Sequence, residues 1–312
     1  MEFKNLKELM TYLKDGKRCR EYYAELRWGG NPVCAHCNAP KPYLLASGKY
    51  RCSDKKCRKD FSITKGTIFE KSKISLATWM GAIFLISGHK KGISSCQLAR
   101  DLGVSQKTGW FLLHRIRHIM GDPEPEPLTN IVEADETYCG GKFANFNRGK
   151  RKFYQENNLD NKVAVMGLLE RDGKARLTII GAKTFKDVIK ENVSTDATLM
   201  TDSHLAYQGL ALEYAGHGVV NHKESQYRDG IAYTNTVEGF FSQLKRSIYG
   251  IYHSVSPKHL QRYCEETSYR YNSRKITDKE RFVQTLKNTN GRLTWKTLVH
   301  KEENTAKKEE VL

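Results

Sequence analysis

Residues 131–139 read Ile-Val-Glu-Ala-Asp-Glu-Thr-Tyr-Cys and are followed by a Gly-Gly pair, a pattern that predicts a β-strand and then a turn. Successive side chains of a strand point to opposite faces of its sheet. Glu133, Asp135 and Thr137 are therefore expected on one face, and Glu136 on the other. Asp135 is the candidate ligand of this stretch, and Glu136 is the less favoured carboxylate.

Downstream of this strand, the pattern is typical of an α/β domain. Asp172-Gly173 is a hairpin signal between two apolar runs, so the first three strands are expected to form a meander. A meander followed by alternating helix and strand is the order of a ribonuclease-H-like fold. The expected elements are strands at 131–139, 163–169, 175–180 and 197–201, and helices at 185–192, 203–210, 235–249 and 257–273.

Two further acidic residues stand at the ends of such elements. Asp202 closes the apolar run 197–201, and Glu238 lies near the start of the helical segment that begins at Asn235. Lys245 follows Glu238 by two helical turns, so both lie on one face of the helix. Two carboxylates on strands and one on a helix can converge on a pair of divalent metal ions, which clamps the oxygens of a phosphodiester. For Asn235 two roles stay open, a helix cap and a site residue.

The charge of the chain indicates a polyanionic partner. Its 312 residues carry a formal net charge of +17, and 39% hydrophobic and 28% charged residues are typical of a globular protein. Residues 1–120 hold 23 Lys+Arg against 9 Asp+Glu, whereas the remaining 192 hold 29 against 26. The N-terminal part is therefore expected to bind phosphates. No apolar run reaches the ~18 residues of a membrane span and no signal-peptide pattern opens the chain, so we expect a cytoplasmic, nucleoid-associated protein.

Four of the eight cysteines form two pairs, Cys34 with Cys37 and Cys52 with Cys57. Two short knuckles separated by about fifteen residues are typical of a structural Zn²⁺ ribbon with four thiolate ligands. His36 is an alternative ligand, but a residue inside a two-residue knuckle is expected to point outward. Buried thiols are expected for the cysteines that occur singly, namely Cys19, Cys96, Cys139 and Cys264.

The segment after the ribbon has the pattern of a helix-turn-helix DNA-binding domain. An apolar helix near 74–86 precedes a helix at 93–102, and Gly103 and Ser105 separate this from a third helix, which runs to about residue 120. Any αα-hairpin produces such a pattern, so the adjacent ribbon and the basic charge carry the DNA interpretation. The candidate DNA-binding residues are Gln106, Lys107 and Thr108 at the start of the third helix, Arg115 further along it, and Lys150 and Arg151 in a basic loop after the first strand of the α/β domain.

These patterns divide the chain into six segments. They are an N-terminal helical segment (1–29), a zinc ribbon (30–65), a helix-turn-helix domain (66–121), a proline-rich linker (122–130), an α/β ribonuclease-H-like catalytic domain (131–275) and a polar C-terminal tail (276–312). The linker is expected to be extended and solvated. In the tail, a short element near 292–298 can dock, and the last dozen residues are expected to be disordered.

Together the motifs resemble those of bacterial insertion-sequence transposases of the DDE type with an N-terminal zinc ribbon, the ISXO-two-like group. The resemblance extends from about residue 20 to residue 275. Its signatures include Asp135-Glu-Thr-Tyr-Cys-Gly-Gly-Lys142, Thr201-Asp-Ser-His-Leu-Ala-Tyr207 and Thr234-Asn-Thr-Val-Glu-Gly-Phe-Phe-Ser-Gln-Leu-Lys245.

The resemblance implies that Asp135, Asp202 and Glu238 bind two Mg²⁺ or Mn²⁺ ions and that Lys245 is the basic residue that follows them. Some relatives place an asparagine in the third position, so Asn235 is an alternative ligand. Glu238 is favoured, because a carboxylate binds Mg²⁺ more strongly than an amide does.

The implied activity is that of a DNA transposase. Such an enzyme binds the terminal inverted repeats of an insertion sequence, cuts a strand to free a 3′-OH, and joins this 3′-OH to target DNA. Action on two ends implies a homodimer or a higher assembly on double-stranded DNA. Two alternatives stay open: a catalytically inactive, sequence-specific DNA-binding regulator derived from a transposase, and a structure-selective nuclease that cuts without joining. Strand-transfer products would distinguish the transposase from both.

Overall fold

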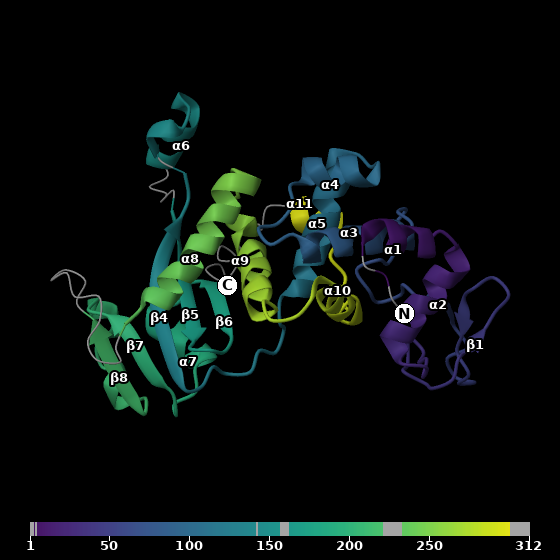
Figure 1. The fold of residues 1–312 in the computed structure, drawn as a ribbon, viewed down its shortest axis with the longest axis horizontal. Coiled ribbons are helices and arrows are strands. Elements are labelled where there is room, and N and C mark those ends of the chain that lie inside the picture. The colour runs from purple at the N-terminus through teal and green to yellow at the C-terminus, as the bar shows by residue number, and fades with distance from the viewer. Residues whose placement is uncertain (1–2, 4, 142, 157–161, 221–232, 300–312) are drawn as a thin grey trace, which may run out of the picture.

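The computed structural model of the chain describes residues 3, 5–141, 143–156, 162–220 and 233–299. In Figure 1 these residues form two lobes. The N-terminal lobe is helical and carries a small three-stranded sheet, and the sheet lobe is built on a five-stranded sheet. None of the described helices combines the length and the apolar character needed to cross a bilayer. The last dozen residues, expected to be disordered, lie outside the described range.

The N-terminal lobe begins its helices where the sequence predicts. The side chains of Ser75, Ser94 and Ser105 each accept a hydrogen bond from the backbone three residues on, and Gly103 ends its helix in the left-handed region at φ 64°. The elements of this lobe are α1 (Leu6–Tyr12), α2 (Gly16–Trp28), β1 (Tyr43–Leu44), β2 (Tyr50–Arg51), β3 (Asp60–Phe61), α3 (Leu76–Gly88), α4 (Ser95–Leu102), α5 (Gln106–Met120), α10 (Asp278–Lys287) and α11 (Trp295–Val299).

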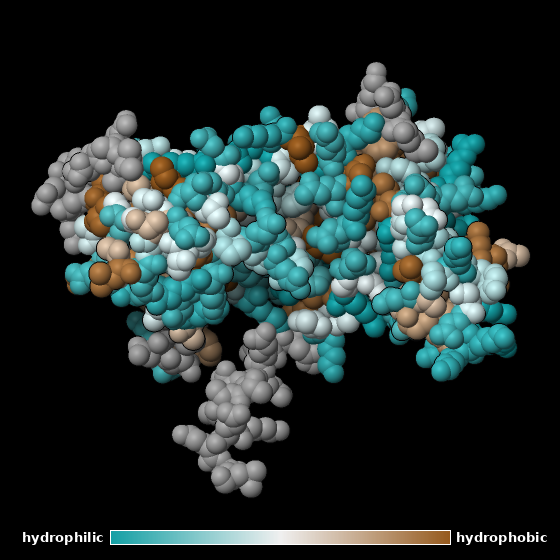
Figure 2. Space-filling model, turned by 90° about the horizontal axis from the view of Figure 1, so that it is seen from below, coloured by the Kyte–Doolittle hydropathy of each residue, from teal (hydrophilic) through white to brown (hydrophobic). Residues whose placement is uncertain are grey.

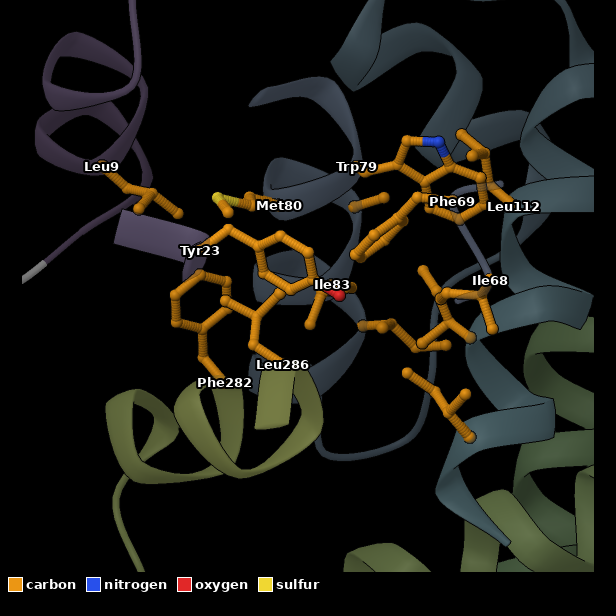
Figure 3. Close-up of a cluster of buried hydrophobic side chains, with 14 of the residues drawn as sticks. Leu9, Tyr23, Ile68, Phe69, Trp79, Met80, Ile83, Leu112, Phe282 and Leu286 are labelled. Atoms are coloured by element: carbon orange, nitrogen blue, oxygen red, sulfur yellow. The ribbon is translucent and has the colours of Figure 1, made fainter. Parts of the chain in front are cut away.

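The C-terminal segment is part of this lobe, contrary to the prediction of a polar tail. Figure 3 shows Phe282 and Leu286 of α10 facing Tyr23 and Ile83 in the core. Both α10 side chains are fully buried. Because α10 has a polar outer face, its composition hides the apolar stripe that packs against α2 and α3. The chain therefore leaves the N-terminal lobe after α5, forms the sheet lobe, and returns to complete the first core.

The five-stranded sheet has the order β6-β5-β4-β7-β8. The first three strands pair antiparallel, and β7 and β8 run parallel to β4. The elements of the sheet lobe are β4 (Ile131–Cys139), η1 (Phe143–Asn145), α6 (Arg148–Glu156), β5 (Val163–Glu170), β6 (Ala175–Ile179), α7 (Phe185–Asn192), β7 (Thr198–Asp202), η2 (Leu205–Tyr207), η3 (Leu210–Leu212), β8 (Gly216–Val220), α8 (Asn235–Ser247), the π-helical turn η5 (Ile248–Tyr252) and α9 (Pro257–Asn272).

Two apolar layers lie on the two faces of this sheet. Val132 and Met166 pack with α7 on one face, and Val165 and Leu169 pack with α8 and α9 on the other. Helix α9 also covers the outer edge of β6. The side chains of Gln261, Ser268 and Asn272 accept hydrogen bonds from the N–H groups of Ile179, Leu177 and Ala175 at 2.7–3.0 Å.

Four local expectations were wrong. The basic loop after β4 contains helix α6, and in place of one helix at 203–210 the chain forms the short 3₁₀ turns η2 and η3, the second of which ends at Leu212. Strand β8 was not predicted, because Gly-His-Gly-Val-Val lacks an alternating pattern. The linker is extended but is not fully solvated. Leu128 is buried, and its N–H donates to the Asn192 carbonyl at 2.8 Å.

Candidate active site

Strands β4 and β7 carry two of the predicted acids toward the same end of the sheet. The parallel ladder between these strands ends at the pair Glu133 and Met200, and Asp135 and Asp202 each stand two residues beyond it. Side chains at equivalent positions of adjacent strands point to the same face, so the two carboxylates share the side that α8 covers. The backbone N–H of His204 donates to Asp202 at 3.1 Å. Glu136 points to the opposite face as predicted, where it accepts a hydrogen bond from the Tyr207 hydroxyl at 2.6 Å.

Helix α8 brings the third acid to this face. Val237 and Phe241 are buried against the sheet, whereas Glu238 is exposed in the first helical turn. Phe241 packs over Gly167, the residue of β5 that pairs with Asp135. The apolar side of α8 therefore fixes its distance from the sheet beside Asp135.

The pKa of Asp135 reflects its burial and the negative charges of the other acids. Burial raises the pKa of the Asp135 carboxyl to about 7, against the effect of the Glu136 N–H, which donates to it at 2.8 Å. The negative charges of Glu136, Asp202 and Glu238 raise this pKa further. The three acids do not all lie within the 4.8 Å that encloses the ligand atoms of the cysteine cluster described below. Such a set of repelling carboxylates is matched in charge by divalent cations, which favour oxygen ligands.

Glu133 is a residue of this site to which the sequence assigned no role. Its carboxylate is fully buried and accepts hydrogen bonds from the N–H groups of Thr236 and Val237, both at 3.0 Å. It also forms an ion pair with Arg171 at 2.8 Å. Glu133 thus satisfies the N-terminal N–H groups of α8 and complements the positive end of the helix dipole. Its position one alternation before Asp135, on the same face, was the signal that could have revealed it.

Asn235 and Lys245 flank the acids on α8. Thr234 is the N-cap of this helix but makes no side-chain capping bond, so Asn235 is not the cap and stands exposed at the first helical position. Lys245 is half-buried near the far end of β4. Burial raises the pKa of the Cys139 thiol and the charge of Lys245 lowers it, so the two groups are close. Both line a cavity of about 290 Å³ together with Tyr154 and Tyr249.

The four predicted zinc ligands form one cluster. Their Sγ atoms all lie within 4.8 Å of one another, with Cys37 and Cys52 at 3.5 Å and Cys34 and Cys57 at 4.0 Å. A tetrahedral Zn²⁺ with ~2.3 Å bonds to sulfur requires sulfurs about 3.8 Å apart, so the cluster fits structural Zn²⁺. His36 is outside the cluster, as expected, and its ring lies 6.2 Å from that of Phe61. Cys19, Cys139 and Cys264 are buried as predicted, but Cys96 is exposed on α4.

The predicted DNA-reading residues stand at the start of α5. Gln106 and Lys107 are exposed, and Thr108 is half-buried. The Gln106 amide donates to the Ser95 hydroxyl at 2.9 Å, and the Lys107 Nζ lies 4.8 Å from the centre of the Trp295 ring. These contacts join the N-terminal end of α5 to α4 and α11.

Arg115 corrects the predicted DNA-binding set. It is 5% exposed, and its guanidinium donates to the carbonyls of Leu293 and Ile68 at 2.7 and 2.5 Å. Arg115 therefore attaches the C-terminal segment to the N-terminal lobe. Arg151 is exposed on α6 but donates to the carbonyls of Ala144 and Phe146 at 2.8 and 2.6 Å, which fixes the loop before this helix. The side chain of Lys150 lies outside the described part of the structure.

Comparison with known proteins identifies two domains in this chain, one in each lobe. A transposase zinc-ribbon domain matches residues 14–60, and an ISXO2-like transposase domain matches residues 127–272. An uncharacterized protein in transposable element ISH50 of Halobacterium salinarum is 25% identical, over 76% of this chain and 84% of that protein. An uncharacterized transposase-like protein of Haemophilus influenzae is 24% identical, over 31% of this chain and 77% of that protein. The chain thus carries an ISXO2-like transposase domain over residues 127–272 and a transposase zinc ribbon over residues 14–60.

Proposed function

We propose that this transposase is a DNA-cutting and DNA-joining enzyme whose sheet lobe is a ribonuclease-H-like catalytic domain. The observation that carries the proposal is the shared face of Asp135, Asp202 and Glu238, where the charges of the last two raise the pKa of the first. The sheet order β6-β5-β4-β7-β8, with two strands parallel to β4, supports the fold assignment.

Asp135, Asp202 and Glu238 would hold two Mg²⁺ ions, for which Mn²⁺ can substitute. When bound, such ions supply Lewis-acid activation and charge neutralisation at a phosphodiester. Glu238 is the preferred third ligand over Asn235, since an ionised carboxylate is the better Mg²⁺ donor. The cysteine cluster would hold a structural Zn²⁺, which stabilises a ribbon too small to have a large apolar core.

The other residues of the site position these ligands and the DNA. Glu133 fixes the first turn of α8, and Gly167 lets this helix approach the sheet. Lys245, about 10 Å further along α8 than Glu238, would contact a phosphate next to the one that reacts. In this reaction a water cuts the strand at the end of the element, and the freed 3′-OH then attacks target DNA.

The N-terminal lobe would recognise the inverted repeats through a helix-turn-helix formed by α4 and α5. Gln106, Lys107 and Thr108 stand where the recognition helix of such a motif meets base edges. Figure 2 shows that hydrophilic residues cover most of one face of the molecule and that hydrophobic residues are scattered over it in small patches. Such a surface, with a net charge of +17, suits a polyanionic partner. Two copies on the two ends of the element complete the proposed assembly.

Cleavage and strand transfer on DNA that carries the element's terminal repeat test this function. The wild type is expected to release a 3′-OH and to join it to a second duplex in the presence of Mg²⁺. Asp135→Asn is expected to abolish both steps and to leave DNA binding intact. Unchanged cutting by this variant would refute the assignment of the site. Binding without any cutting by the wild type would favour the inactive regulator, and cutting without joining would favour the nuclease.

A further inference from the structure

A small basic hollow lies at the junction of the two lobes, away from the acids. It has a volume of about 220 Å³ and is lined by cationic and polar side chains. The loop between α3 and α4 contributes Lys90 and Lys91, α8 contributes Arg246 and α9 contributes Arg270. No carboxylate is among the described residues that line it. Resting on the function proposed above, we infer that this junction hollow binds one backbone phosphate of the DNA that runs from the N-terminal lobe to the acids.

The lysine loop is held in place by a buried charge network. Arg270 donates to the carbonyls of Ile86 and His89, at 2.8 Å for Ile86, and pairs with Glu266 at 2.6 Å. Glu266 is 2% exposed and also pairs with Arg117 of α5, at 2.6 Å. Burial opposes its ionisation, but the two arginines hold the pKa of Glu266 well below its usual range. One carboxylate thus faces two guanidinium groups, and the excess positive charge lies beside the hollow.

Gly92 allows the loop between α3 and α4 to pack against Tyr252. Gly92 has φ 96°, and a Cβ at this position would lie 1.9 Å from the Tyr252 hydroxyl. That hydroxyl donates to Glu266 at 2.8 Å. Only glycine therefore allows the loop to rest on Tyr252, and the loop cannot move without disturbing the buried network. The two lysines are held in a fixed place above α8, although they are exposed.

The chemistry of the hollow fits a phosphate. Arg270 is engaged by Glu266 and by the loop carbonyls, which leaves Lys90, Lys91 and Arg246 for a ligand. Within the described part of the chain, the two lysine Nζ atoms have no hydrogen-bond partner, and Arg246 donates only its Nε, to the Ser242 carbonyl at 3.1 Å. Lysine and arginine around a small polar cavity are typical phosphate contacts. Arg246 follows Glu238 by eight residues, which is about 12 Å along α8. The same DNA molecule can therefore reach both the hollow and the acids.

The salt dependence of DNA binding tests the inference. Each phosphate that a protein neutralises contributes about 0.9 to the slope of log K against log salt. The double variant Lys90→Ala/Lys91→Ala is expected to lower the magnitude of this slope by about 1 and to weaken binding roughly tenfold at moderate salt. Because a phosphate contact carries no sequence information, the loss should be equal on a duplex with the terminal repeat and on a random duplex of the same length. Lys287→Ala, an exposed lysine on α10, is the matched control and should keep the wild-type slope.

A variant that keeps every charge but displaces the loop distinguishes a positioned phosphate site from general electrostatic attraction to DNA. Gly92→Ala should move the loop away from Tyr252 and lower the magnitude of the salt slope, as the double alanine variant does. Lys90→Arg/Lys91→Arg keeps both charges and should have the wild-type slope. A wild-type slope in the double alanine variant, which alters only exposed side chains, would overturn the inference whatever the folding state of Gly92→Ala. Cleavage by the wild type reports separately on the proposed function. A wild type that cuts DNA, with a slope that the lysines do not affect, refutes the hollow alone.

Discussion

Gly167 lies directly opposite Asp135 in the antiparallel β4–β5 ladder, and its missing side chain makes room for α8. A Cβ at residue 167 would lie 2.5 Å from Cε1 of Phe241 and 2.8 Å from Cγ2 of Val237. Cβ atoms do not approach other atoms this closely, so the helix can rest at its present height only above a glycine. The separation of Glu238 from Asp135 thus depends on a residue that contributes no side chain to the site.

Gly167→Ala should therefore impair chemistry more than binding. Overpacking of this kind costs about 1–3 kcal/mol of stability and moves α8 outward. We expect the single-turnover cleavage rate to fall at least roughly tenfold, because misplacement by about 1 Å has large effects on catalysis. Binding to the same duplex should be unchanged. Gly239→Ala, on α8 with open space at its Cα, is the control and should cut normally.

Glu133→Gln should loosen the first turn of α8. The substitution leaves the Arg171 guanidinium without its buried anionic partner, and breaking such a pair costs about 3–5 kcal/mol. Chemical denaturation should show this loss, and cleavage should need a higher Mg²⁺ concentration than in the wild type. A second substitution, Arg171→Gln, should recover part of the stability, so the double-mutant cycle should be non-additive. Additive losses of stability would mean that Glu133 and Arg171 do not stabilise the fold as a pair.

The stability of the protein in buffer without Mg²⁺ or Mn²⁺ should fall as the pH rises through 7. The folded pKa of Asp135 is about 7, raised from 3.8. Its contribution is therefore complete below pH 3.8, falls while the carboxyl is ionised in the unfolded chain but still protonated in the folded protein, and is gone once the pH has risen through 7. Asp135→Asn removes this dependence. Between pH 5 and pH 8, the free energy of unfolding of Asp135→Asn should therefore rise by on the order of 1–2 kcal/mol relative to that of the wild type. This figure is reduced for the partial exposure of Asp135. Mg²⁺ should stabilise only the wild type at pH 8, and an equal response of both proteins would argue against a metal site.

Removal of zinc should unfold the ribbon and leave the sheet lobe folded. Cys52→Ser takes one ligand from the cluster, and the binding energy of structural Zn²⁺ is also folding energy. We expect loss of the bound zinc, measured by elemental analysis, together with loss of specific DNA binding. Cys96→Ser changes an exposed thiol outside the cluster and should retain both.

Phe282→Ala should destabilise the N-terminal lobe from a position far along the chain. The ring is fully buried in the core of the N-terminal lobe, where it packs edge-to-face with the rings of Phe3 and Phe84, and loss of such a ring costs about 3–5 kcal/mol. Limited proteolysis should then attack residues 5–121 before the sheet lobe, and DNA binding should weaken. Lys287→Ala on the same helix should have no such effect. Preferential cleavage of the sheet lobe instead would contradict this assignment of α10.

The sequence predicted those parts of the fold that local patterns specify. Serine caps and Gly103 mark the helices of the N-terminal lobe, and the cysteine spacing marks the ribbon, because these signals act within a few residues. Arg115 could not be placed in this way. An arginine on a basic helix is usually solvated, and only the return of the chain after α9 brings the Leu293 carbonyl to it.

The candidate site likewise combines residues that local patterns reveal with one whose role they do not reveal. Asp135, Asp202 and Glu238 were found from their positions at the ends of predicted elements. Glu133 was visible as a residue on the correct face, but its role depends on where α8 begins in space, since its bonds run to residues more than 100 positions away. Contacts of this kind arise from tertiary packing and have no local signature.

Helix α9 closes one side of the five-stranded sheet to other chains. Gln261, Ser268 and Asn272 occupy the N–H groups with which a strand from a second molecule would pair along β6. β-augmentation is therefore blocked there, and a second copy of the chain cannot extend this sheet along β6. Contacts between copies must come from helices, loops or other strands, which can form and separate without remodelling this edge.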